Sequence, residues 1–101
     1  MRLNEEQIQR QLTRLHDWQW DKDRSLIWRE FHFSDFDQTM HFVNAVAHIA
    51  RQEDHHPVMQ VSYNHCLINY STHSLGGVST KDFRCAQRID ELKQGSRQNH
   101  V

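Results

Sequence analysis

The residues best suited to chemistry are histidines, and four of the nine lie between positions 55 and 73. His55 and His56 are adjacent and stand directly before Pro57, the one proline of the chain, and His73 follows in the tripeptide STH. An imidazole with an ordinary pKa of about 6.5 gains and loses a proton near neutral pH. The cluster therefore predicts one of three things: a metal site, a site of proton transfer, or ordinary surface histidines.

A metal ion or a nucleophile explains the cluster less well than proton transfer does. Zinc sites bring together three or four ligands, often in HExxH or paired-cysteine spacings, and neither spacing occurs. His41 and His48 share a predicted helical face but have no evident third ligand, and Cys66 and Cys85 alternate onto predicted core faces. We expect buried, reduced thiols, no metal and no cofactor. The bystander histidines, solvated or packed, are taken to be His16, His32, His41, His65 and His100, and His48 stays open.

Hydrophobic periodicity and capping residues predict the elements that position these histidines. In chain order they are a helix at 5–15, strands near 18–20 and 26–33, a helix ending near 51, strands at 59–63 and 66–72, and a helix after Ser79. The predicted caps are Asn4 with Gln7, Ser34 or Asp35, and Ser79 with Asp82. The order α-β-β-α-β-β-α favours an α+β fold, a four-stranded antiparallel sheet with three helices packed on one face. Residues 1–94 would form a single domain and residues 95–101 a polar tail.

The hairpin at 59–72 decides which histidines become neighbours. With Asn64 and His65 as its two loop residues, paired numbers add up to 129, so His56 faces His73. Directly opposed residues have Cβ atoms about 4.5 to 5.5 Å apart, and a change of one residue in the loop would destroy this pairing. Pro57 forces an extended conformation on His56, and His55 joins the same pocket only if the backbone turns there.

The composition limits which compartment and which binding partners we expect for this protein. The formal charge is −1, with 12 Lys and Arg against 13 Asp and Glu, so no basic field attracts nucleic acid. The amino terminus is charged and no apolar run approaches the roughly 18 residues of a membrane span. We therefore expect a cytoplasmic protein, with the nucleus also compatible in a eukaryote. A hydrophobic fraction of 37% and two apolar stripes on the second helix predict self-association.

Several motifs together resemble those of one family. They are FHFSDF at 31–36, DHHP at 54–57, YN at 63–64, STH at 71–73, GGVSTKDF at 76–83 and RID at 88–90. In order and spacing they resemble the pterin-4a-carbinolamine dehydratases, and the likeness covers nearly the whole chain. The resemblance implies an α+β protein, dimeric or tetrameric, that uses no metal. It would remove water from 4a-hydroxytetrahydropterin, the product of aromatic amino acid hydroxylases, to give quinonoid dihydropterin in tetrahydrobiopterin recycling.

The resemblance also implies a set of site residues. The catalytic set would be His55, His56 and His73, and the pterin-binding set Asp54, His55, His56, Ser71, Thr72, His73 and Ser74. Losing water from carbon 4a requires one proton delivered and another removed, which suits imidazoles. Asp54 would orient an imidazole or bind the pterin's amino group, but a solvated carboxylate is an equal alternative. For Asp82 we prefer helix capping over catalysis.

Two departures from the family pattern lie close to the histidine pair in the sequence. Arg51 stands where many relatives carry an acidic residue, and Met59 where others carry Trp.

Some relatives also serve as dimerisation cofactors for a transcription factor, which makes a non-catalytic protein-interaction module the alternative to an enzyme. The broad apolar arc of the second helix would suit such a role, and it would equally suit a homotetramer.

Overall fold

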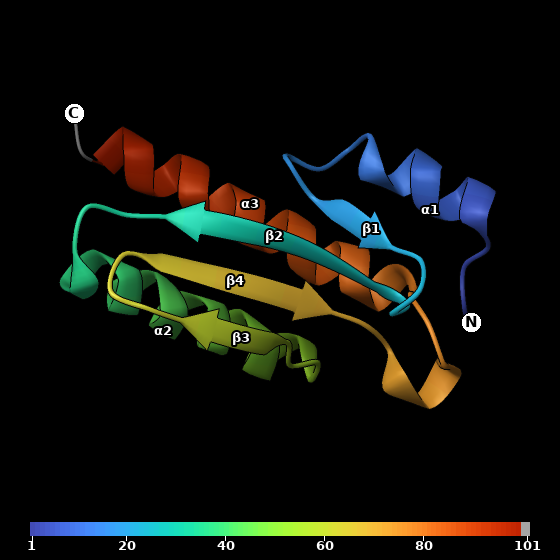
Figure 1. The fold of residues 1–101 in the computed structure, drawn as a ribbon. Helices are drawn as coiled ribbons and strands as arrows, with labels where there is room; N and C mark the ends of the chain where they lie inside the picture. The colour runs from blue at the N-terminus through green and yellow to red at the C-terminus, as the bar shows by residue number, and fades with distance from the viewer. Residues whose placement is uncertain (100–101) are drawn as a thin grey trace.

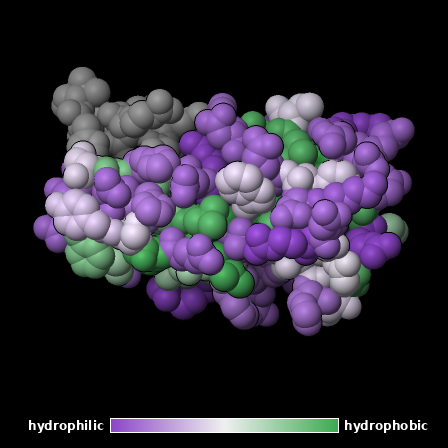
Figure 2. All heavy atoms as spheres, in the orientation of Figure 1, coloured by the Kyte–Doolittle hydropathy of each residue, from purple (hydrophilic) through white to green (hydrophobic). Residues whose placement is uncertain are grey.

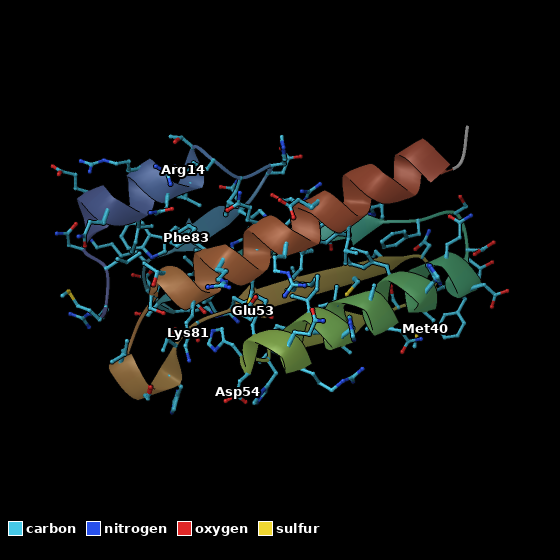
Figure 3. The ribbon with its side chains drawn as sticks, turned by 180° about the vertical axis from the view of Figure 1, so that it is seen from behind. Arg14, Met40, Glu53, Asp54, Lys81 and Phe83 are labelled. Atoms are coloured by element: carbon cyan, nitrogen blue, oxygen red, sulfur yellow. The ribbon has the colours of Figure 1, made fainter. Side chains whose placement is uncertain are left out.

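The computed structural model describes residues 1–99, with side-chain detail for residues 1–92. The elements are α1 (Glu5–Leu12), β1 (Gln19–Asp21), β2 (Leu26–His32), α2 (Phe36–Glu53), β3 (Val58–Val61), β4 (His65–Tyr70), the short 3-10 helix η1 (His73–Leu75) and α3 (Thr80–Asn99). The strands form one antiparallel sheet in the order β1-β2-β4-β3. Figure 1 shows α2 and α3 behind this sheet, and the reverse view in Figure 3 shows the three helices on the near side. The predicted α+β class and element order are confirmed.

The core lies between the sheet and the helices. Alternation places one side of β2 and one side of β4 against the helices, and the residues there that are at most 1% exposed are Ile27, Phe31, Cys66, Ile68 and Tyr70. The helices supply Phe42, Val46, Ile49, Phe83, Ala86 and Ile89. Burying a side chain of this kind contributes about 1.5 to 3 kcal/mol. The two cysteines are free and buried, as predicted.

The other face of the sheet carries no helix. Trp28 and Leu67 are half-buried there, while Val58 is exposed. Figure 2 shows this face, where hydrophobic residues are interspersed with hydrophilic ones. A second half-exposed surface belongs to α2, whose outer stripe of Met40, Val43 and Ala47 continues to the exposed Phe36.

The predicted hairpin register is wrong by one loop position. The pairs run from Val58 with Asn69 to Val61 with Cys66, so paired numbers add up to 127 and the loop residues are Tyr63 and Asn64. Tertiary contacts fix this turn: the carbonyl of Tyr63 accepts from Thr39 Oγ1 at 3.1 Å and that of Asn64 accepts from the Phe33 amide at 2.8 Å.

The register changes which histidines can be neighbours. The ladder of β3 and β4 begins at Val58, and continuing its numbering would set His56 against Ser71 rather than against His73. The cross-strand pair of His56 and His73 predicted from the sequence is therefore wrong. Any closeness of these two imidazoles would have to come from the segments that flank the strands.

The helix ends also differ from those expected. Helix α1 ends at Leu12 rather than near Leu15, although Leu15 still packs against the core. Helix α2 continues to Glu53, and α3 runs past Gly95 to Asn99, so the division at 94 and 95 stays a prediction. Residues 100 and 101, and with them His100, lie outside the described part. No helix in that part is both long enough and apolar enough to cross a membrane.

Candidate active site

The site begins where α2 ends, at a sharp turn of the backbone. Asp54 adopts the left-handed conformation, with φ 52° and ψ 44°, and its amide donates to the carbonyls of Ala50 and Arg51. The amide of His55 also donates to the Ala50 carbonyl, at 3.0 Å. A left-handed residue after the last turn is a common way to stop a helix. This is the backbone turn that His55 requires to enter a pocket with His56.

His55 is held on three sides. Its Nε2 lies 2.6 Å from Oδ1 of Asp82, its ring stacks on that of Tyr70 with centroids 5.2 Å apart, and its carbonyl accepts from the Tyr70 hydroxyl at 3.0 Å. The side chain is only 13% exposed. We assign the proton of this bond to Nε2 of His55, because an ionised carboxylate can only accept, and this assignment leaves the lone pair of the neutral imidazole on Nδ1.

Asp82 joins three segments of the chain. Its carboxylate is fully buried, and Oδ2 accepts from Thr72 Oγ1 and from the Ser79 amide, both at 2.9 Å. The Ser79 contact confirms the predicted capping role. The contact with His55 was not predicted, because capping alone already explained the residue. Thr72, expected to bind substrate, points its hydroxyl to Asp82.

A pocket of about 540 Å³ opens at the turn that follows α2. It is lined by Ala47, Ala50, Arg51, Asp54, His55, His56, Pro57 and Met59. Three of the predicted site residues, Asp54, His55 and His56, are thus brought together. The size falls within the usual range of roughly 300 to 1,000 Å³ for small-molecule sites.

The second predicted segment, residues 71–74, supplies none of the residues that line this pocket. His73 and Ser74 are exposed on η1, and Ser71 is half-buried. Thr72 is buried, and its bond to Asp82 connects this segment to His55. The roles of Ser71, His73 and Ser74 stay predictions.

An ionic cluster fixes the end of α2 against α3, as the position of Glu53 between the helices in Figure 3 illustrates. Glu53 is 15% exposed and accepts from Arg84 at 3.0 Å and from Arg88 at 2.9 Å. Arg88 also donates to Gln52 at 2.6 Å. This cluster was not predicted from the sequence. It matters for the site because Glu53 directly precedes Asp54 and the histidine pair.

The two buried thiols of the protein, Cys66 and Cys85, are poor nucleophiles. Burial raises the pKa of Cys66 to about 11, and burial is also the main cause that raises the pKa of Cys85. Both side chains are therefore protonated near neutral pH. No group of three or more His, Cys, Asp or Glu side chains in the described residues converges as metal ligands do, and metal independence remains a prediction.

Fold and pocket together define a small α+β protein with a histidine-lined site suited to acid-base chemistry. The family model described as "Pterin 4 alpha carbinolamine dehydratase" matches residues 1–92, and the chain belongs to this family. A protein of Legionella pneumophila (strain Corby), named "Putative pterin-4-alpha-carbinolamine dehydratase", is 46% identical over 91 residues, which are 89% of this chain and 80% of that protein. One of Nitrosomonas eutropha with the same name is 47% identical over 91 residues, 89% of this chain and 79% of that protein.

Two solved structures share the fold. A transcriptional coactivator/pterin dehydratase from Brucella melitensis has a TM-score of 0.88 and 33% identity, with 91% of this chain and 98% of that chain covered. A pterin dehydratase-like protein identified as a RuBisCO assembly factor in the alpha-carboxysome has a TM-score of 0.66 and 22% identity, with 78% and 92% covered. The second likeness concerns the fold alone. The resemblance seen in the sequence is confirmed at the level of the family.

Proposed function

We propose that this protein is a pterin-4a-carbinolamine dehydratase that removes water from 4a-hydroxytetrahydropterin and releases quinonoid dihydropterin. The observation that carries the proposal is the pair of adjacent histidines lining one pocket, with His55 fixed by the buried carboxylate of Asp82. An imidazole held by a carboxylate is a well-oriented proton acceptor. Its neighbour His56 is exposed to solvent, which suits the role of acid.

The reaction is an elimination that needs two proton transfers. The bond from carbon 4a to the hydroxyl oxygen breaks, and the oxygen leaves as water with the bonding electrons and one delivered proton. The adjacent ring nitrogen loses its proton, and the freed electron pair forms the carbon–nitrogen double bond. We assign removal of this proton to Nδ1 of His55 and delivery of the other to His56.

The remaining contacts of the substrate follow from the family. We propose His73 as the third catalytic imidazole, reaching the pterin from η1, and Asp54, Ser71, Thr72 and Ser74 as binding residues. Asp54 lines the pocket and suits the pterin's amino group. The pterin is the substrate, and no cofactor or metal is part of the proposal, so exhaustive chelation is expected to leave the rate unchanged.

The proposal extends to the cellular setting. The reaction would belong to tetrahydrobiopterin recycling in the cytoplasm and serve an aromatic amino acid hydroxylase. The protein would be a homodimer or homotetramer without direct contact to nucleic acid or membrane. The outer stripe of α2, where Phe36 is 47% exposed, supports association between copies.

A non-catalytic interaction module is the second candidate. The Brucella protein is described as a transcriptional coactivator as well as a pterin dehydratase, and the outer stripe of α2 offers a surface for a partner. The intact pocket favours the enzyme, because a pure binding module has no need for a histidine fixed by a buried carboxylate.

A dehydration assay separates the two classes. The substrate is generated in situ from a reduced pterin, and formation of the quinonoid product is followed by absorbance against the spontaneous rate. Acceleration that depends on protein concentration supports the enzyme. A folded protein that leaves the spontaneous rate unchanged would overturn the proposal in favour of the interaction module.

A further inference from the structure

We propose that Tyr70 is a positioning residue for the reaction, acting on His55 through both its ring and its hydroxyl. The inference rests on the proposed function, in which His55 transfers a proton. Tyr70 is the last residue of β4 and is fully buried. It is absent from the residues that line the pocket, so it would act on the substrate only through His55.

Two separate contacts join Tyr70 to His55. The two rings are stacked, with centroids 5.2 Å apart and planes inclined by 26°. The Tyr70 hydroxyl donates to the main-chain carbonyl of His55 at 3.0 Å. One side chain therefore restrains both the ring plane and the backbone of the same histidine.

Packing of the core does not by itself require the Tyr70 hydroxyl. A buried hydroxyl is costly unless it finds a partner, so a phenylalanine would fill an apolar core position at lower cost. The partner is the carbonyl of the residue just after the left-handed turn at Asp54. Cys85 Sγ lies 4.0 Å from the same carbonyl. Two buried donors, the Tyr70 hydroxyl and the Cys85 thiol, thus contact the His55 carbonyl at the turn that orients the histidine pair.

Each of the three contacts of His55 restrains a different feature of this residue. Asp82 accepts a hydrogen bond from Nε2–H and so selects the tautomer, while the Tyr70 ring limits rotation of the imidazole plane. The Tyr70 hydroxyl fixes the main chain from which the imidazole projects. Burial raises the pKa of Tyr70 far above its ordinary value, so the hydroxyl stays a donor at every pH at which the protein works.

The test compares Tyr70→Phe, which keeps the ring, with Tyr70→Leu, which removes both contacts. Ile68→Val is the matched control, because Ile68 is equally buried on the same side of β4, two residues earlier. We expect Tyr70→Phe to lower kcat about 2- to 12-fold, the range of one net hydrogen bond, with KM unchanged. Tyr70→Leu should lower kcat further, and Ile68→Val should leave it unaltered.

A second readout does not depend on activity. Long-range ¹H–¹⁵N spectra of the histidine rings, with the His55 signals identified by their loss in His55→Gln, report tautomer and ring environment. In both Tyr70 variants the His55 signals should shift or broaden, and in Ile68→Val they should not. Circular dichroism verifies that each compared variant is folded.

The outcomes separate this inference from the proposed function. A wild-type protein without dehydratase activity refutes the function, while the spectra still test whether Tyr70 fixes His55. An active wild-type protein whose Tyr70→Phe variant keeps both its kcat and its His55 signals overturns the positioning role. Equal losses in Tyr70→Phe and Ile68→Val would overturn it as well, because they would reflect core packing alone.

Discussion

His55 and Asp82 lie 27 residues apart in the chain, yet Nε2 of the histidine is 2.6 Å from Oδ1 of the aspartate. The contact joins the turn after α2 to the first turn of α3, and in Figure 3 Asp54 and Lys81, the neighbours of the two residues, mark these helix ends. The carboxylate is fully buried, so it has little freedom to turn away from the imidazole. The bond thereby links the packing of the helices to the orientation of the His55 ring.

Replacing Asp82 by Asn tests this link. An amide of the same shape can donate to Nε2, which would favour the opposite tautomer of His55. We expect the dehydration rate to fall on the order of 10²-fold, the cost of a displaced catalytic group. The rate is measured together with the His55 ring signals and the thermal unfolding midpoint.

Asp90→Asn is the matched control for Asp82→Asn. Asp90 is also a buried carboxylate of α3, but it accepts from Trp18 Nε1 and from Arg29, both at 2.8 Å. Each substitution should cost about 1 to 3 kcal/mol of stability, and only Asp82→Asn should slow the reaction. Similar rates in the two variants would show that the Asp82 carboxylate matters for folding alone.

The fold was predictable because its signals are local. The Asn4 and Gln7 capping box forms as expected, with each side chain accepting from the other residue's backbone amide at 2.9 Å, and the stripe of Phe42, Val46 and Ile49 is buried. The hairpin register was not predictable in this way, because partners distant in sequence hold the two loop carbonyls. The local free energy of the hairpin differs little between a loop at 63–64 and a loop at 64–65, so tertiary contacts decide the register.

Cys66 should make stability depend on pH in alkaline solution. Burial raises its pKa from about 9 to about 11, so the folded state favours the protonated thiol. Its contribution is fully present below about pH 9 and is lost as the pH rises through about 11, because the unfolded chain ionises first. Tyr70, with a pKa raised in the same direction, adds to this loss.

Urea unfolding across this pH range measures the effect. We expect the free energy of unfolding to fall between pH 9 and pH 11, with Cys66→Ala less stable at neutral pH but less sensitive to pH. The expected part due to Cys66 is about 2 to 3 kcal/mol, from a shift of roughly two pKa units. A pH dependence identical in the wild type and the variant would contradict the buried, protonated thiol.

Self-association should involve the outer stripe of α2. Val43 is half-buried on this stripe, whereas Val46 is fully buried in the core. We expect light scattering to give two or four chains at micromolar concentration and Val43→Asp to reduce the mass, since burying a charge in an apolar interface is costly. Asn44→Asp adds the same charge at the exposed neighbouring position and should not. A monomeric wild type, or equal masses for both variants, would refute the interface.

The site was predictable in its parts but not in its connections. The DHHP motif identified His55 and His56, because two imidazoles before a proline are locally distinctive. The contacts that hold His55 come from Tyr70 and Asp82, and Glu53 fixes the end of α2 just before the histidine pair through two arginines of α3. Each of these three residues has an ordinary local explanation as core, cap or surface charge. Only the packing of β4 and α3 against the end of α2 gives them a role in the site.

His56→Ala tests the proposed acid–base pair most directly. His56 lines the pocket and is exposed, so its loss should cost little stability, within about 0.5 kcal/mol. If it delivers a proton to the departing hydroxyl, the enzymatic rate should fall by roughly 10² to 10⁴. The control is His65→Ala, because His65 begins β4 beside the hairpin turn and contacts Ser62 at 2.6 Å instead of the pocket. Should both variants, folded by circular dichroism, dehydrate the pterin at the same rate, the exposed imidazole beside Pro57 takes no part in proton transfer.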